Sequence, residues 1–197
     1  MESDNTYALI NMNIKKFRYM NYVYGRKAAN KILRDLEKAI RNILKDDEII
    51  VRRDADDFII LVSYESKKQL ELKWIRDLMD LIFDIDNTCI YHNIYTSFGI
   101  YFIESKEVPF EEAFEKAQFC RFRCESLDRR VFSYEIYNQA TYDEYMNTCY
   151  MEEYTAKARE QGLYQVYIQP KIELSTGKII GGEALLRLLD HGKLIPA

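Results

Sequence analysis

Residues 49–62 read IIVRRDADDFIILV, and this stretch decides the fold. Two runs of apolar, mostly β-branched residues, 49–51 and 58–62, flank a polar segment of arginine and aspartate at 52–57. Runs of this length and composition are typical of strands, and a short polar segment between them is typical of a turn. The stretch therefore predicts a β-hairpin with a strongly charged tip.

The sequence on either side of this hairpin alternates between strand and helix patterns. Strands are expected at 7–13, 95–102 and 130–134, where short apolar or β-forming runs occur. Helices are expected at 28–44, at 70–82 and after Pro109, where apolar residues recur every three or four positions. The order is that of a split βαβ arrangement. We therefore predict an α+β fold, with helices packed on one face of a mainly antiparallel or mixed sheet.

The C-terminal part of the chain has a different pattern. Residues 139–162 contain no proline and close with Gly162, which predicts a connecting helix with a glycine cap. Beyond it, short apolar runs at 166–168 and 179–180 flank STGK at 175–178, a turn between two strands. The predicted organisation is a first domain at 1–138, a connecting helix at 139–162, and the start of a second domain at 163–197.

The composition limits the classes of function. A net charge of -4 and a pI of about 5.4 give no broad basic field, so we expect no nucleic-acid partner. No apolar run approaches the roughly 20 residues that a bilayer requires. The polar start MESDN lacks the apolar stretch of a secretion signal. We expect a cytoplasmic chain without a membrane segment.

The cysteines and histidines give no pattern of a metal site. They are scattered and form no CxxC pair: Cys89, Cys120, Cys124, Cys149, His92 and His191. Cys120 and Cys124 share one face of a predicted helix with Ala113 and Ala117, which favours packing in the core over zinc or redox chemistry.

The hairpin and its surroundings resemble the GGDEF domains of diguanylate cyclases. Residues 52–58, RRDADDF, resemble RxGGDEF, with Arg52, Asp56 and Phe58 in place and Asp57 as a shortened glutamate. Upstream, Phe17, Asn21 and Gly25 fit F-K-x-x-N-D-x-x-G-H, and downstream TSFG at 96–99 resembles T-x-S-x-G. The resemblance spans about residues 7–134. The D-x-L-T-G-L-x-N-R segment and the first helix of the family are missing before it.

The resemblance implies a ferredoxin-like or palm-type fold that binds GTP across the hairpin, holds two magnesium ions and forms cyclic di-GMP in a head-to-head dimer. Carried over position by position, it places the two metal-binding aspartates on Asn13 and Lys15, and a third metal carboxylate on Asp56. It places guanine recognition on Asn21 and Asn30, and the phosphate-binding cations on Glu125 and Arg129. Since only some of these keep the required chemistry, we expect Mg²⁺ to bind weakly and not to be required for the fold.

The two hairpin glycines of the family correspond to Asp54 and Ala55. Glycine lets a backbone approach a phosphate and present its N–H groups, whereas Asp54 adds a like charge and Ala55 adds a methyl group. The catalytic hairpin at Asp54, Ala55, Asp56, Asp57 and Phe58 is therefore expected to be inactive. An alternative is that its aspartates simply solvate a turn.

The inhibitory product site of the family, R-x-x-D, corresponds to Lys45 and Glu48. Lysine lacks the bidentate geometry of arginine, so an ion pair at a helix end or a solvated loop is expected here instead of a product site.

Residues 167–187 resemble the opening of EAL phosphodiesterases of cyclic di-GMP. The matching segments are YIQP at 167–170, TGKI at 176–179 and GEALLR at 182–187. The resemblance implies the first strands of a truncated (β/α) barrel, with Glu183 as a metal ligand at a strand end and Arg187 as a phosphate contact. Both roles belong to a complete EAL domain, so we expect no hydrolysis by this chain. The alternative for Glu183 is an exposed carboxylate at the end of a strand.

Three functions remain open on these grounds. The first is a regulatory module of a cyclic di-GMP signalling protein that senses GTP or cyclic di-GMP, or forms a homodimer, and controls an adjoining EAL domain. The second is a weakly active diguanylate cyclase. The third is a structural spacer without a ligand.

Overall fold

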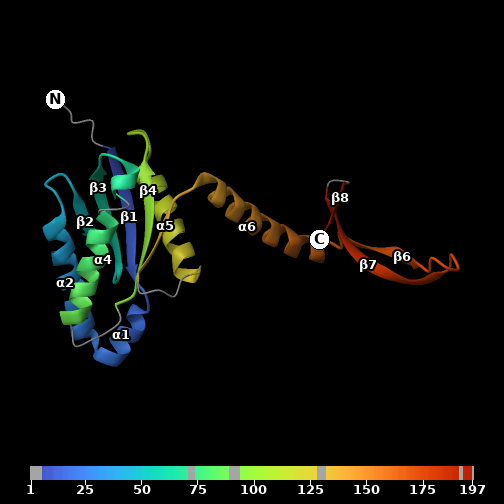
Figure 1. Ribbon diagram of the computed structural model, residues 1–197, viewed down its shortest axis with the longest axis horizontal. Coiled ribbons are helices and arrows are strands. Elements are labelled where there is room, and N and C mark those ends of the chain that lie inside the picture. Colours follow the sequence, from blue (N-terminus) through green and yellow to red (C-terminus); the bar gives the residue numbers. More distant parts are fainter. Residues whose placement is uncertain (1–5, 71–73, 89–93, 128–131, 191–192, 197) are drawn as a thin grey trace. The chain divides into compact units, whose positions relative to one another are not determined.

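The computed structural model describes residues 6–70, 74–88, 94–127, 132–190 and 193–196 (Figure 1). The chain divides into two compact units, Met1–Gln139 and Ala140–Ala197. Over the described residues, the helices are all too short or too polar to cross a bilayer.

The first unit is built on a five-stranded sheet in the order β2-β3-β1-β4-β5. Its strands are β1 (Thr6–Ile14), β2 (Ile49–Arg52), β3 (Asp57–Tyr64), β4 (Thr96–Ile103) and β5 (Phe132–Ile136). β1 is antiparallel to both β3 and β4, β2 is antiparallel to β3, and only β4 and β5 are parallel. The hairpin and the mainly antiparallel sheet are thereby confirmed.

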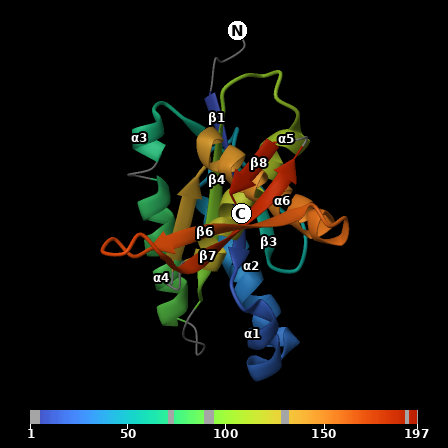
Figure 2. The same ribbon diagram turned by 90° about the vertical axis from the view of Figure 1, so that its right-hand side faces the viewer.

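Helices cover both faces of this sheet, so the prediction of a single covered face was wrong. The helices are α1 (Phe17–Tyr24), α2 (Arg26–Ile43), α3 (Lys67–Gln69), α4 (Ile75–Thr88) and α5 (Phe110–Leu127). In both views α4 and α5 lie on opposite sides of β4 (Figures 1 and 2). The cause lies in β1, where every residue from Ala8 to Met12 is buried. Because successive side chains of a strand point to opposite faces, a strand buried throughout needs cover on both.

The two cores have different sizes. The larger one joins Ile10 and Met12 of β1 to Ile32 and Leu36 of α2 and Leu78 of α4. The smaller one lies under α5 and contains Leu9, Tyr101, Ala113 and Ala117. Phe110 is exposed at the first turn of α5.

Gly25 separates α1 from α2. Its φ of 81° and ψ of 154° lie in a region that L-residues avoid, so the chain changes direction there. The predicted amphipathic helix corresponds to α2, which ends at Ile43. α1 was not expected as a separate helix.

Gly99 allows α5 to pack directly on β4. A Cβ atom at this position would lie 1.8 Å from the carbonyl oxygen of Ala117 and 2.4 Å from the backbone nitrogen of Arg121. Since no side chain fits at such distances, the glycine sets how closely the helix approaches the sheet.

The second unit contains α6 and a three-stranded sheet. α6 (Gln139–Glu160) is followed by Gly162, whose φ is 69°, and the N–H of Leu163 donates to the carbonyl of Ala158 at 2.9 Å. The antiparallel strands are β6 (Tyr164–Ile172), β7 (Ile179–Asp190) and β8 (Lys193–Pro196). The turn predicted at 175–178 thus joins two paired strands, whereas the barrel remains a prediction.

Candidate functional site

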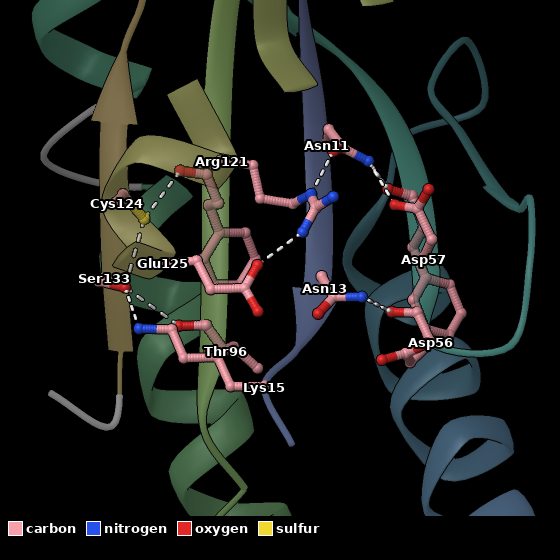
Figure 3. A network of polar contacts seen from close by, with 12 residues as sticks. Asn11, Asn13, Lys15, Asp56, Asp57, Thr96, Arg121, Cys124, Glu125 and Ser133 are labelled. Atoms are coloured by element: carbon pink, nitrogen blue, oxygen red, sulfur yellow. Dashed lines mark hydrogen bonds and ion pairs between the residues drawn. The ribbon is translucent and has the colours of Figure 1, made fainter. Parts of the chain in front are cut away.

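The candidate site lies at one end of the five-stranded sheet. There the C-terminal end of β1 meets the N-terminal ends of β3 and β4, because both pair with β1 in the antiparallel sense. Asn13 lies opposite Asp57 on one side and Ser97 on the other. The N–H of Lys15 donates to the carbonyl of Tyr95 at 2.7 Å, which ties the chain after β1 to the start of β4. Figure 3 shows the side chains gathered at this end.

The hairpin tip satisfies its own backbone donors. The carboxylate Oδ1 of Asp54 accepts the N–H of Ala55 at 2.7 Å, and the N–H of Asp54 donates to the carbonyl of Asp57 at 3.4 Å. The guanidinium Nε of Arg52 donates to the carbonyl of Ala55 at 2.9 Å. Phe58 anchors the start of β3 in the core, where it is fully buried. The tip is therefore a closed turn whose N–H groups at 54 and 55 are engaged within it.

The backbone of the tip is ordinary. Over the part of the chain that the structure describes, Lys16 alone among non-glycine residues has a φ in the left-handed region. Asp54 and Ala55 therefore occupy the two glycine positions without backbone strain.

The three positions that correspond to metal ligands form a poor magnesium site. The amide Nδ2 of Asn13 donates to the backbone carbonyl of Asp56 at 3.2 Å. Lys15 is buried, and its Nζ donates to Ser133 Oγ at 2.7 Å. Asp56 is the one carboxylate of the three, and Mg²⁺ prefers carboxylate and other oxygen ligands in octahedral array. A buried ammonium does not meet that need, so these residues do not fit the ion.

Burial also affects Asp56 directly. It raises the pKa of the half-buried carboxyl, an effect that a hydrogen bond from the Asn13 side chain opposes. Among the described residues, no three side chains of histidine, cysteine, aspartate or glutamate come together as a metal cluster.

A buried polar network that the sequence reasoning missed links the hairpin to α5. Arg121 Nε donates to Asn11 Oδ1 at 2.6 Å, and Asn11 Nδ2 donates to Asp57 Oδ1 at 2.5 Å. Arg121 Nη1 also forms an ion pair with Glu125 Oε2 at 2.8 Å. Figure 3 shows Arg121 reaching from α5 to Asn11 of β1. The available signal was Asn11, the first of two asparagines in the apolar strand pattern of residues 7–13, and one arginine beside the apolar face of α5.

Glu125 consequently does not stand free at the phosphate position. Its carboxylate, partly exposed, neutralises Arg121 one helical turn earlier. Arg129, the other predicted phosphate contact, lies outside the described residues.

The two predicted guanine-binding amides lie on different helices, α1 and α2. Asn21 Nδ2 donates to the carbonyl of Phe17 at 3.2 Å, within α1. Asn30 is exposed on α2. Base recognition by these residues stays a prediction.

Glu48 holds the start of β2 in place. Its carboxylate accepts the N–H of Lys45 at 2.9 Å, the N–H of Ser63 at 3.0 Å and the hydroxyl of Ser63 at 2.9 Å. Lys45 Nζ lies 3.6 Å from the same carboxylate, which agrees with the expected ion pair. The alternative of a solvated loop was wrong for Glu48, because its side chain is only 2% exposed.

The two EAL-like residues lie in β7. Glu183 pairs with Gln169 in the interior of the strand, so its expected position at a strand end was wrong. Its carboxylate is exposed and lies 3.8 Å from Lys171 Nζ. Arg187 Nη1 donates to the carbonyl of Leu186 at 2.8 Å.

Known sequences match the first unit and the chain as a whole. The family described as "Diguanylate cyclase, GGDEF domain" matches residues 1–121. The chain is 26% identical to cyclic di-GMP phosphodiesterase PdeR of Escherichia coli (strain K12), over 93% of this chain and 27% of PdeR. The chain thus spans about a quarter of the length of the curated relatives it matches.

Solved structures support the fold. An EAL/GGDEF domain protein from M. capsulatus superposes with a TM-score of 0.53 at 18% identity, covering 70% of this chain and 88% of that one. The S helix-GGDEF-EAL part of Vibrio cholerae LapD, bound to c-di-GMP, gives a TM-score of 0.57 at 13% identity, covering 99% of this chain and 45% of that one. Since the family match takes in more than half of the chain, including the whole of β1 to β4 and the hairpin between them, the protein belongs to the GGDEF domain family.

Proposed function

We propose that this chain is part of a cyclic di-GMP signalling protein, in which its GGDEF domain is a non-catalytic regulatory module for an adjoining EAL domain. Its similarity to PdeR, a cyclic di-GMP phosphodiesterase, and to the GGDEF-EAL part of LapD supports this proposal. The EAL-like segments at 167–187 support the presence of the second domain.

The observation that carries the proposal is the contact between Asp54 and Ala55. A carboxylate that accepts the Ala55 N–H takes away a donor that a phosphate group would need. It also places a negative charge beside the turn. At about 4 Å and an effective dielectric constant near 20, each pair of like unit charges costs on the order of 4 kcal/mol before solvent relaxes around it. GTP binding across this tip is therefore opposed by both effects.

The replaced metal ligands act in the same direction. Two-metal catalysis of phosphoryl transfer requires paired cations that stabilise the attacking and leaving oxygens. Asn13 and Lys15 supply one amide and one ammonium, and the ammonium is already bonded to Ser133. These replacements support a domain that keeps the fold of the family and lacks its catalytic activity.

Turnover and binding measured on the same purified chain test the proposal. The chain is incubated with GTP and Mg²⁺, and cyclic di-GMP is sought by chromatography. Calorimetry then measures binding of GTP and of cyclic di-GMP with and without Mg²⁺, and sedimentation measures the dimer. Binding or ligand-dependent dimerisation without product supports the regulatory module. Steady product formation would show an active cyclase. If calorimetry detected no binding of either nucleotide, a structural spacer would be the remaining function.

A further inference from the structure

The strongest unexplained feature is a charged side chain buried between α5 and the sheet. Arg121 is 5% exposed and Asn11 is completely buried, and both lie beside the apolar cluster of Leu9, Tyr101, Ala113 and Ala117. Burying an arginine is unfavourable unless its hydrogen bonds are satisfied. An apolar pair would fill the same space without that cost, so the polar pair calls for a role beyond packing.

The amide of Asn11 has only one orientation that suits its neighbours. Its oxygen accepts from the guanidinium of Arg121, and its nitrogen donates to Asp57 Oδ1 and to the carbonyl of Phe58 at 3.2 Å. A reversed amide would place a donor against the cation and an acceptor against the carboxylate. Asn11 therefore joins α5 to the base of the hairpin, with its oxygen facing Arg121 and its nitrogen facing Asp57.

The hairpin tip is attached to the same carboxylate. Arg53 Nη1 lies 3.5 Å from Asp57 Oδ2, and the N–H of Arg53 donates to the carbonyl of Asp57 at 2.9 Å. These two contacts link the loop at 53–56 to the residue that Asn11 holds.

Two and three residues after Arg121, α5 is also bonded to β5. Arg123 Nε forms an ion pair with Glu135 at 2.9 Å, and Cys124 Sγ lies 3.3 Å from Ser133 Oγ. Only Tyr137 and Asn138 separate β5 from α6. The polar contacts thus run from the hairpin through β1 and α5 to the strand that precedes the connecting helix.

We infer that Arg121 is a positioning residue that couples the hairpin to α5 and β5. A change in the hairpin that moves Asp57 is passed through Asn11 and Arg121 to the segment leading into α6. This coupling goes beyond the proposed function, because it does not depend on whether a nucleotide binds, and its test uses none.

Hydrogen exchange of the full chain, followed by mass spectrometry, tests the coupling. Asp57→Asn perturbs the hairpin, and exchange is measured at residues 132–138 in the native background and in Arg121→Met. In the native background the substitution should speed exchange at 132–138 roughly three- to tenfold, because it removes the charge that strengthens the bond from Asn11 and the ion pair with Arg53. In Arg121→Met the same substitution should leave exchange at 132–138 unchanged.

Two further variants keep the test decisive. Arg41→Met is the matched control, because Arg41 is a cation of α2 in an i,i+4 ion pair with Glu37 and should preserve the response to Asp57→Asn. If Arg121→Met does not fold, the double variant Asn11→Leu/Arg121→Met replaces it with an apolar pair. The inference is overturned if Asp57→Asn has no effect at 132–138 in the native background, or has the same effect with and without Arg121.

Discussion

The carboxylate of Asp54 accepts the backbone N–H of the next residue, Ala55, at 2.7 Å, so the hairpin tip bonds to itself where it would otherwise face a ligand. Replacing both residues in Asp54→Gly/Ala55→Gly should free that N–H and remove one negative charge. We expect GTP to bind at least about tenfold more tightly than to the native chain, equivalent to about 1.4 kcal/mol. Calorimetry with GTP and Mg²⁺ measures this change.

No cyclic di-GMP should form in that variant, because Asn13 and Lys15 still fail to supply metal ligands. The control is Asp46→Ala, which removes the same charge from an exposed position before β2. Equal affinities of the glycine variant and the control for GTP would contradict the role given to the tip.

Gly99→Ala should be among the most destabilising single changes in the first unit. The new methyl group would overlap the backbone of α5 at Ala117 and Arg121, and rigid backbone cannot move aside as a flexible side chain can. We expect a loss of about 3 kcal/mol or more in the free energy of unfolding. Denaturant unfolding followed by the fluorescence of Trp74, the single tryptophan, provides the measurement.

Gly25→Ala is the comparison for Gly99→Ala. Its Cβ would meet no atom within 4 Å, so only the backbone conformation, with φ 81° and ψ 154°, is unfavourable, at a cost of about 1–3 kcal/mol. If Gly25→Ala were the more damaging of the two, close packing of α5 would not be the reason for Gly99.

Glu48→Ala should cost far more stability than Lys45→Ala. Removal of the buried carboxylate leaves the N–H groups of Lys45 and Ser63 without their acceptor, at about 1–3 kcal/mol. The Lys45 side chain is 66% exposed, and an ion pair with such an exposed partner contributes about 0–1 kcal/mol. Thermal unfolding of both variants at one pH checks the order, and similar losses would show that the ion pair, not the backbone contacts, is what Glu48 provides.

Cys120 and Cys124 should resist alkylation in the folded chain while Cys149 reacts. Burial raises the pKa of the Cys120 thiol from about 9.0 to about 12, and burial also raises the pKa of Cys124. The reactive thiolate is thus disfavoured. Iodoacetamide at pH 8 on a Cys89→Ser background, with mass spectrometry of the peptides, compares the three sites. Rapid labelling of Cys120 without unfolding would contradict its burial.

The same pKa has a consequence for stability. Because folding raises it, the Cys120 thiol supports the folded state fully below pH 9, and this contribution is lost as the pH rises from about 9 to about 12. Cys120→Ala should flatten the fall of the melting temperature over that range.

Much of the first unit was predictable because its strands and helices carry regular apolar patterns. The hairpin of β2 and β3 follows from residues 49–62 alone, since both runs are short, apolar and separated by a charged turn. The covering of the second face was not predicted, because α5 packs with small residues, Ala113 and Ala117, on Gly99. A stripe of small residues indicates a close contact but does not say which face receives it.

The candidate site was predictable only where the chemistry is local. Asn13, Lys15 and Asp56 could be placed from their positions in the motifs. Asn11 and Arg121 could not, because their bond joins residues 110 positions apart in the chain. Glu183 was expected at a strand end but lies inside β7, which extends from Ile179 to Asp190. The length of β7 depends on its pairing with β6, which the local sequence does not show.

Lys15 gives this sheet end a fixed positive charge. A dissolved cation exchanges with the solvent, so an edge that depends on one changes its charge as the cation's concentration changes. The ammonium of Lys15 is part of the chain and donates a hydrogen bond to Ser133 of β5, so it stays in place at any concentration of dissolved cations. Chelating agents and shifts in cellular magnesium should accordingly leave the shape of this edge unaltered.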